Sequence, residues 1–233
     1  MSILSLSIPA MPFPPTFYGL DTDRELARLE LGPNAQDRFV DAVEAGHIDA
    51  GQATTYSARS DAGSRRWYRM VQVLRERLHV DLGWHKKDTG GCTLSLRPDG
   101  LIAVQVARGT YRTGLPGYGP SFANPKGVYT VRAADINQMV MRDPLTGQTM
   151  ATVPKYSDTP PPWVTWFLMY YVDRTEDSLE VRSELSLLNS LSADGRACTW
   201  GQRNVIRSMP ITDEPAIGLP PESTGDADIR RQA

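Results

Sequence analysis

The middle of the sequence concentrates side chains that can bind anions. Residues 59–142 carry 14 Lys and Arg against 6 Asp and Glu, a net charge of +8, whereas residues 1–58 and 143–233 each carry −5. The whole chain stands at −2, which excludes an overtly basic nucleic-acid protein. Its basic residues are 21 Arg and only 4 Lys, and a guanidinium offers a planar fork of donors that matches phosphate and carboxylate. We expect an anion-binding surface formed by Arg59, Arg65, Arg66, Arg69, Lys86, Lys87, Arg108 and Arg112.

Two interpretations of this basic segment stay open. Trp67, Tyr68 and Trp84 lie among the basic residues, and basic and aromatic groups together can contact phosphates and stack on bases. This combination predicts nucleic acid, or an acidic protein, as the partner. Alternatively, the arginines neutralise the acidic ends of the same chain, which requires no partner at all.

The long connection of residues 108–127 is a second candidate site. It contains five Gly and three Pro, and connections of this length are usually functional or disordered. Leu115 and Pro116 follow Gly114 where a phosphate-binding loop requires Lys and Ser or Thr, so this pattern is absent. We expect a loop that stacks on and neutralises a ligand through Tyr111, Tyr118, Phe122 and Lys126.

The signals for catalysis and for metal binding are weak. Cys92 has His85 nearby in sequence, but a nucleophilic thiol needs a base within hydrogen-bonding distance, so we expect a buried thiol on a strand. The three histidines and two cysteines show no zinc-ligand spacing. We therefore predict no metal, no cofactor, and binding rather than catalysis. The alternatives are a hydrolase-like enzyme with residues 108–127 as its active-site lid, or an oligomeric assembly component.

Helical patterns occupy the first third of the chain. Residues 22–25 have the form of a capping box, and we expect helices over 22–31, 34–46, 50–57 and 64–78. The last of these has the clearest period, because its apolar residues recur at helical spacing. These are Trp67, Met70, Val71, Leu74 and Leu78.

Alternating patterns replace the helical ones after residue 80. A Pro98-Asp99-Gly100 turn predicts a hairpin between residues 93–97 and 101–107. Further hairpins are expected to join 138–142 to 148–153, and 163–172 to 179–188, with a short strand near 204–207. Residues 163–172 are apolar on both faces, which is typical of a central strand. Glu180, Arg182 and Glu184 alternate along its partner, so we expect them to face solvent.

These patterns predict an α+β fold with N-terminal helices packed on a mostly antiparallel sheet built from consecutive hairpins. We expect an extended arm over 1–15, a helical region over 16–80, and an antiparallel β region over 81–208 that forms one compact domain with it. The tail, 209–233, is expected to be disordered. No apolar run approaches the ~20 residues of a membrane helix, and the two cysteines indicate a cytoplasmic chain without membrane contact. A homo-oligomer is compatible with the charge pattern.

Overall fold

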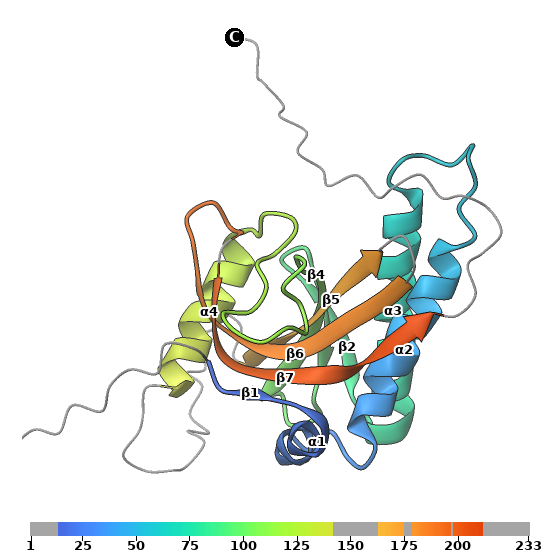
Figure 1. Cartoon of the computed structure of the whole chain (residues 1–233). Helices are drawn as coiled ribbons and strands as arrows, with labels where there is room; N and C mark the ends of the chain where they lie inside the picture. The colour runs from blue at the N-terminus through green and yellow to red at the C-terminus, as the bar shows by residue number, and fades with distance from the viewer. Residues whose placement is uncertain (1–13, 142–162, 175–178, 197, 212–233) are drawn as a thin grey trace, which may run out of the picture.

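The computed structural model describes residues 14–141, 163–174, 179–196 and 198–211 (Figure 1). In this part of the chain a single seven-stranded sheet has the strand order β1-β7-β6-β5-β4-β3-β2. The elements are β1 (Thr16–Phe17), α1 (Gly19–Arg28), α2 (Ala35–Ala50), α3 (Asp61–Leu82), β2 (His85–Thr89), β3 (Cys92–Leu96), β4 (Ile102–Arg108), α4 (Val128–Met141), β5 (Val164–Arg174), β6 (Leu179–Leu191) and β7 (Cys198–Ile211).

The sheet consists of two antiparallel meanders joined side by side. Strands β2, β3 and β4 pair antiparallel in sequence order, as do β5, β6 and β7. The pairs β4–β5 and β1–β7 are parallel. The α+β class and the mostly antiparallel sheet are therefore confirmed, whereas the consecutive hairpins hold only within each meander. Parallel neighbours need a long crossover, and the crossover from β4 to β5 contains the loop of residues 108–127 and α4.

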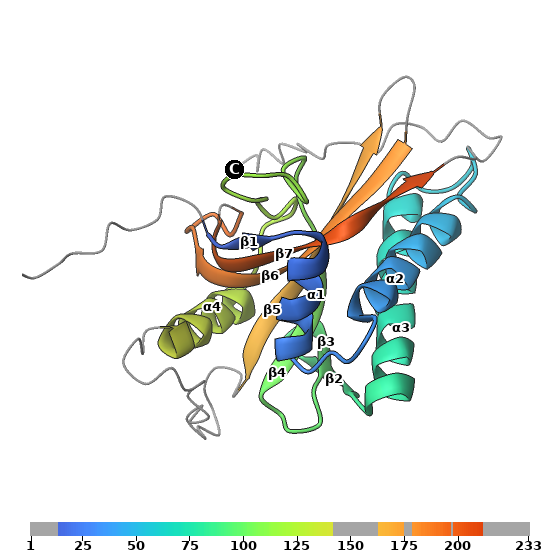
Figure 2. The same ribbon diagram turned by 60° about the horizontal axis from the view of Figure 1, so that its bottom comes forward.

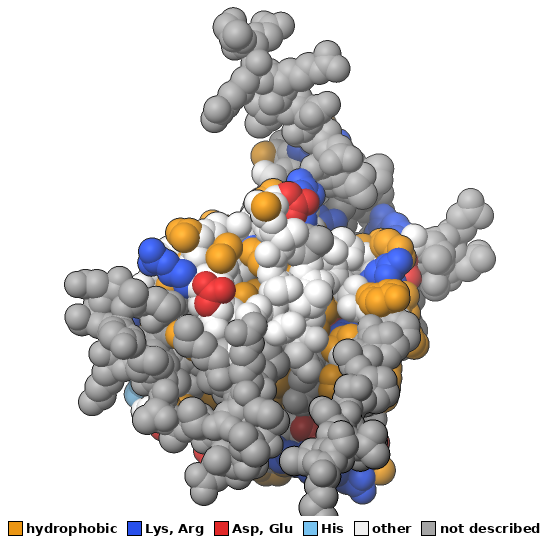
Figure 3. All heavy atoms as spheres, turned by 90° about the vertical axis from the view of Figure 1, so that its left-hand side faces the viewer, with side chains coloured by type: hydrophobic (Ala, Val, Ile, Leu, Met, Phe, Trp, Pro, Cys, Tyr) orange, Lys and Arg blue, Asp and Glu red, His pale blue; other side chains and the backbone are white. Residues whose placement is uncertain are grey.

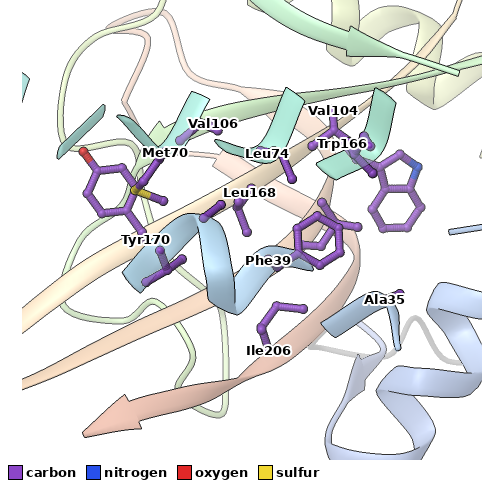
Figure 4. Packing of buried hydrophobic residues seen from close by; sticks show 14 of the residues in the cluster. Ala35, Phe39, Met70, Leu74, Val104, Val106, Trp166, Leu168, Tyr170 and Ile206 are labelled. Carbon is purple, nitrogen blue, oxygen red and sulfur yellow. The ribbon is translucent and has the colours of Figure 1, made fainter. Parts of the chain in front are cut away.

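Helices α2 and α3 cover one face of the sheet (Figures 1 and 2). The predicted stripe of α3 points inward, with Met70, Leu74 and Leu78 at 1% exposure or less. Figure 4 shows Phe39 of α2 and Leu74 of α3 converging with side chains of the central strands. The indole of Trp67 is half-buried and donates a hydrogen bond to the Val106 carbonyl oxygen, at 3.2 Å. This cluster is the main hydrophobic core.

The opposite face is covered by α4 and the loop of residues 108–127. A second apolar cluster fills this layer, with members from β4, β5, β6, β7, the loop and α4. Asn137 fastens the helix to the sheet, because its amide donates to the carbonyl oxygens of Thr165 (2.9 Å) and Leu188 (2.8 Å). Its Oδ1 accepts the Thr165 N–H at 2.9 Å. The predicted strand over residues 138–142 is therefore wrong as far as Met141, since α4 continues to that residue.

Other expectations have mixed outcomes. The 93–107 and 163–188 hairpins are confirmed, and β5 is buried on both faces over most of its length. Of residues 50–57, Ala50 ends α2 and the others form turns and bends rather than a helix; α3 begins at Asp61 rather than at residue 64. Strand β2 was not predicted, and β7 continues to Ile211, into the expected tail. Residues 1–13, 142–162 and 212–233 lie outside the described residues. Most of the expected arm, the expected strand over 148–153 and most of the expected tail therefore also lie outside them.

Both edges of the sheet carry features that oppose pairing with another strand. At one edge β2 exposes Lys86 and Lys87, and charged side chains are a common protection of edge strands. At the other edge β1 pairs with only two residues of β7, and beyond them the Thr22 hydroxyl of α1 donates to the Val205 carbonyl oxygen at 3.0 Å. The N–H of Arg207 donates to Oε1 of Gln36 in α2, also at 3.0 Å. Figure 2 shows α1 beside β7. No helix in the described part of the chain is long and apolar enough to cross a bilayer.

The contact between α2 and α3 predicts the effect of a single methyl group. A Cβ added at Gly46 would lie 2.4 Å from Cγ of Met70 and 2.7 Å from the Arg66 carbonyl oxygen. We expect Gly46→Ala to lower the free energy of unfolding by about 1–3 kcal/mol, the usual cost of overpacking, as measured by urea denaturation. Gly63→Ala in α3 is the matched control, because nothing lies within 4 Å of that Cβ. It should leave stability unchanged or raise it by up to about 1 kcal/mol; equal losses in both variants would contradict the packing argument.

Candidate anion-binding site

Several arginines of the basic segment, and others near it, pair with carboxylates of the same chain. Arg65 pairs with Asp61 at 3.0 Å along α3, and Arg75 pairs with Asp88 of β2. The guanidinium of Arg77 lies 2.8 Å from a carboxylate oxygen of Asp41 in α2, and that of Arg38 lies 2.7 Å from Asp81. Arg97 pairs with Asp99 in the hairpin turn and lowers the pKa of that carboxyl through a hydrogen bond. These pairs occupy individual guanidinium groups, but Asp61, Asp88 and Asp99 lie within residues 59–142 themselves, so of these pairs only Arg77–Asp41 offsets the net charge of +8.

The eight predicted anion-binding residues are distributed over several parts of the surface. Arg65, Arg66 and Arg69 lie in the first half of α3, with Arg59 just before it, and Arg66 is buried at 4% exposure. Lys86 and Lys87 lie on the edge strand β2, Arg108 ends β4, and Arg112 belongs to the loop on the α4 side. On the described part of the face in Figure 3, Lys and Arg side chains stand apart from one another.

The loop of residues 108–127 packs onto the sheet along its length. The indole of Trp200 in β7 donates to the Pro120 carbonyl oxygen at 2.9 Å. Phe122 is 1% exposed, and its ring centroid lies 5.2 Å from that of Phe167 in an edge-to-face contact. The guanidinium of Arg196 donates to the Ala123 carbonyl oxygen at 3.0 Å. Of the four residues predicted to bind a ligand through this loop, Phe122 is therefore part of the core.

A buried ion pair lies beneath the first half of the loop. Glu184 of β6 and Arg203 of β7 are both fully buried, and Nε of Arg203 donates to Oε1 of Glu184 at 3.0 Å. The other carboxylate oxygen accepts the Gly114 N–H at 2.8 Å, and the Ser186 hydroxyl adds a third donor. Arg203 in turn donates to the carbonyl oxygens of Leu115 (3.0 Å) and Gly117 (3.2 Å). The two side chains therefore bind the loop backbone as well as each other.

The predicted solvent face of β6 is wrong for two of its three charged residues. Glu184 is fully buried and Arg182 is only 8% exposed, because the loop covers this side of the strand. The guanidinium of Arg182 lies 2.8 Å from Asp173 of β5 and donates to the Tyr111 carbonyl oxygen at 3.0 Å. Glu180 alone remains partly exposed. The one feature of the sequence that pointed to these buried ion pairs was the presence of charged residues inside an otherwise apolar β region.

Glycine allows the loop to approach the ion pair closely. Gly119 has a φ of +86°, and a Cβ there would lie 2.8 Å from Cδ1 of Trp200 and 2.9 Å from Nε of Arg203. Gly114, whose N–H binds Glu184, has a φ of +73°. Side chains rarely adopt such positive φ values, so both positions require glycine for the loop to follow this path.

The outer side of the anchored loop presents an exposed cluster, which we call the Tyr–Arg cluster: Tyr111, Arg112 and Tyr118. The two tyrosines are 58% and 61% exposed, and Arg112 is also exposed. Nε of Arg112 donates to the Tyr111 hydroxyl oxygen at 3.1 Å, which raises the pKa of Arg112, and its guanidinium lies 5.7 Å from the Tyr111 ring centroid. Among the described residues, no ion pair joins Arg112 to a carboxylate.

An open pocket of about 290 Å³ is lined by another part of the same loop. Its lining includes Tyr18 at the start of α1, Gly114 and Leu115 of the loop, and Arg182 and Arg207 of the sheet. Burial raises the pKa of Tyr18, and the nearby Arg203 opposes this rise. Glu180 also lines the pocket and Arg207 pairs with Asp37, so the pocket carries both signs of charge. Tyr18, Arg182 and Arg203 were not predicted as site residues, because only the folded loop brings them together.

The buried pair predicts that mutations of its two residues have non-additive effects on the free energy of unfolding. Removing one partner leaves an uncompensated buried charge, which typically costs about 3–5 kcal/mol. We expect Arg203→Met or Glu184→Gln to destabilise strongly, and the double variant to lose less than the sum of the two. Urea denaturation measures this cycle, and faster tryptic cleavage after Arg112 in the single variants reports release of the loop. Arg207→Ala, which removes an exposed partner of Asp37, should cost under about 1 kcal/mol; strict additivity of the buried pair would contradict the interpretation.

Comparison with known proteins identifies no family for this chain. No protein-family model and no curated protein matches the sequence, and no solved structure matches the fold. The function must therefore be argued from the site itself rather than from a likeness.

Proposed function

We propose that this protein is a non-catalytic binding protein that contacts an anionic partner through the Tyr–Arg cluster. One observation carries the proposal: the exposed guanidinium of Arg112 lies against the ring of Tyr111 on an anchored loop, near the equally exposed Tyr118, with no carboxylate partner in the described part of the chain. Arg65, Arg75, Arg77 and Arg97, by contrast, pair with carboxylates of the same chain. What favours Arg112 within the predicted set is its contact with an exposed aromatic ring on an anchored loop.

The chemistry of the cluster suits a binding surface. Tyrosine and arginine are the residues that most often dominate binding energy at interfaces. Arginine donates paired hydrogen bonds to phosphate or carboxylate, and the tyrosine rings offer flat apolar faces. Because the loop is fixed from beneath by Glu184 and Arg203, little conformational entropy is lost on binding. A preorganised loop thus compensates for the small size of the cluster.

Single-stranded nucleic acid fits this chemistry better than the other anionic partners. It exposes phosphates together with unstacked bases, and base stacking on an aromatic side chain contributes about 1–3 kcal/mol per base. A duplex hides its base faces, and an acidic peptide offers carboxylates without planar rings. The pocket lined by Gly114 and Leu115 of the same loop also contains Tyr18, a further aromatic ring on which a neighbouring base could stack.

The alternative of an enzyme with a mobile lid finds less support. Opening residues 108–127 would remove the Gly114, Leu115 and Gly117 backbone partners from the buried pair. It would also expose Phe122, which packs between Phe167 and Trp200. Each lost buried hydrogen bond costs on the order of 1–3 kcal/mol, so these contacts favour a closed loop.

Salt-dependent binding to a fluorescent single-stranded oligonucleotide tests the proposal. We expect Arg112→Gln to weaken binding about tenfold, because a charge-assisted hydrogen bond contributes roughly 1.5–3 kcal/mol, and to reduce the slope of log K against log salt by about 1. Tyr118→Ala should weaken binding with little change in that slope.

Arg77→Gln is the matched control, since it removes the same charge from α3 on the helical side of the sheet. It should bind nearly as the wild type does. The proposal fails if the wild-type protein does not bind at about 50 mM salt, or if Arg77→Gln weakens binding as much as Arg112→Gln. Binding to poly-glutamate in preference to the oligonucleotide would point to an acidic protein instead.

A further inference from the structure

Strand β2 forms an edge of the sheet that is open to pairing. It is the last strand in the sheet order, and all five of its residues pair with β3, on one side only. The side chains from His85 to Asp88 are exposed. At the opposite edge, by contrast, α1 and α2 bind backbone groups of β7. Among the described strands, β2 therefore offers the accessible edge, and such an edge is a template for an added strand.

The turn between β2 and β3 determines which backbone groups of β2 point outward. Residues 90–91 are both glycine with positive φ values, 56° and 75°, and Thr89 pairs with Cys92 across them. A two-residue turn of this kind closes with a hydrogen-bonded pair, and bonded and non-bonded pairs then alternate along the two strands. The N–H and C=O groups of Lys86 and Asp88 therefore point away from β3. Within the described residues, no turn, loop or cap hydrogen bond engages these four groups.

Both ends of this open edge are fixed by the fold. Before it, the N–H of Trp84 donates to the Leu78 carbonyl oxygen at 3.2 Å, and Nδ1 of His79 lies 2.9 Å from the Trp84 carbonyl oxygen. After it comes the glycine turn. The free backbone groups are thus confined to Lys86 and Asp88, which suits a short extended segment. Because so short a ladder provides few backbone bonds, side chains must contribute to the choice of partner.

The charge of the β2 edge is positive on both faces of the sheet. Lys86 and Lys87 are consecutive, so their side chains point to opposite faces. In the part of the chain that the structure describes, neither lysine pairs with a carboxylate. Asp88, the acidic residue of the strand, pairs instead with Arg75 of α3. Two positive charges therefore remain at the edge, one on each face.

We propose that β2 binds an extended acidic segment of a partner protein as an added antiparallel strand. Backbone bonds to Lys86 and Asp88 supply affinity, as is usual in strand addition. Two consecutive acidic residues opposite Lys86 and Lys87 form cross-strand ion pairs on the two faces. A second copy of β2 would bring two further lysines to the edge, so the same charges disfavour self-pairing. This surface is separate from the Tyr–Arg cluster and does not rest on the proposed function.

Amide hydrogen exchange, followed by NMR on the full chain, tests the backbone ladder. The probe is the capped peptide Val-Thr-Glu-Glu-Thr-Val at millimolar concentration and about 50 mM salt, where charge screening is modest. We expect exchange of the Lys86 and Asp88 amides to slow several-fold, whereas the Lys87 amide, already bonded to β3, changes little. The same peptide methylated on its backbone nitrogens cannot donate to β2 and should give no protection. Absence of protection by the first peptide, or equal protection by both, overturns the proposal.

Matched charge reversals test whether the acidic side chains meet this edge. Lys86→Glu combined with Lys87→Glu should weaken binding of the peptide about tenfold, because like charges then face each other across the strands. Arg24→Glu combined with Arg28→Glu is the control. It makes the same change in net charge at exposed positions of α1, at the opposite edge, and should leave binding unchanged. Thermal denaturation confirms that both double variants fold.

A neutral peptide completes the test of charge. Val-Thr-Gln-Gln-Thr-Val keeps the backbone and loses both charges, so it should bind the wild-type protein several-fold more weakly than the acidic peptide. Equal binding of the two peptides overturns the acidic partner. Equal weakening by the two double variants shows that the peptide responds to the net charge of the protein rather than to β2, and overturns the proposed site.

Discussion

The buried pair of Glu184 and Arg203 is the constraint on which the loop side of the molecule depends. Neither side chain has any exposure, and removing two charges from water is costly unless other hydrogen bonds satisfy them. Those bonds come from the loop: the Gly114 N–H on the carboxylate, and the Leu115 and Gly117 carbonyls on the guanidinium. The loop must stay in place for the pair to be tolerated, and the pair in turn fixes the loop.

A loop anchored in this way has an exposed outer side and a packed inner side. Its outer side presents Tyr111, Arg112 and Tyr118 to solvent, while its last residues hold Lys126 against the sheet near Cys92. Between them, Phe122 and the Trp200 contact fill the core. This packed middle separates the exposed Tyr–Arg cluster from the half-buried Lys126.

Many arginines in the described part of the chain pair with carboxylates of the same chain. On the helical side, Arg38, Arg65 and Arg77 meet carboxylates at the surface, where each pair contributes little, typically ~0–1 kcal/mol. On the loop side, Arg182 and Arg203 are buried and join strands to loop backbone. The same residue type thus performs two tasks, and the net charge of a segment does not distinguish them. Burial and the identity of each partner do.

Local patterns in the sequence were sufficient for the elements whose stability is local. The Pro98-Asp99-Gly100 turn specified its hairpin, the apolar stripe of α3 specified its buried face, and the two-sided apolar run of β5 specified a central strand. Tertiary structure alone decided the remainder: that β4 and β5 pair in parallel, that residues 128–141 form a helix fastened by Asn137, and that Glu184 is buried. The reason is that periodicity records which side chains avoid water, whereas a charged residue can be buried only when a distant segment supplies its partners. Glu184 contacts Arg203 and Gly114 only in the folded chain, so no sequence pattern around residue 184 could predict these partners.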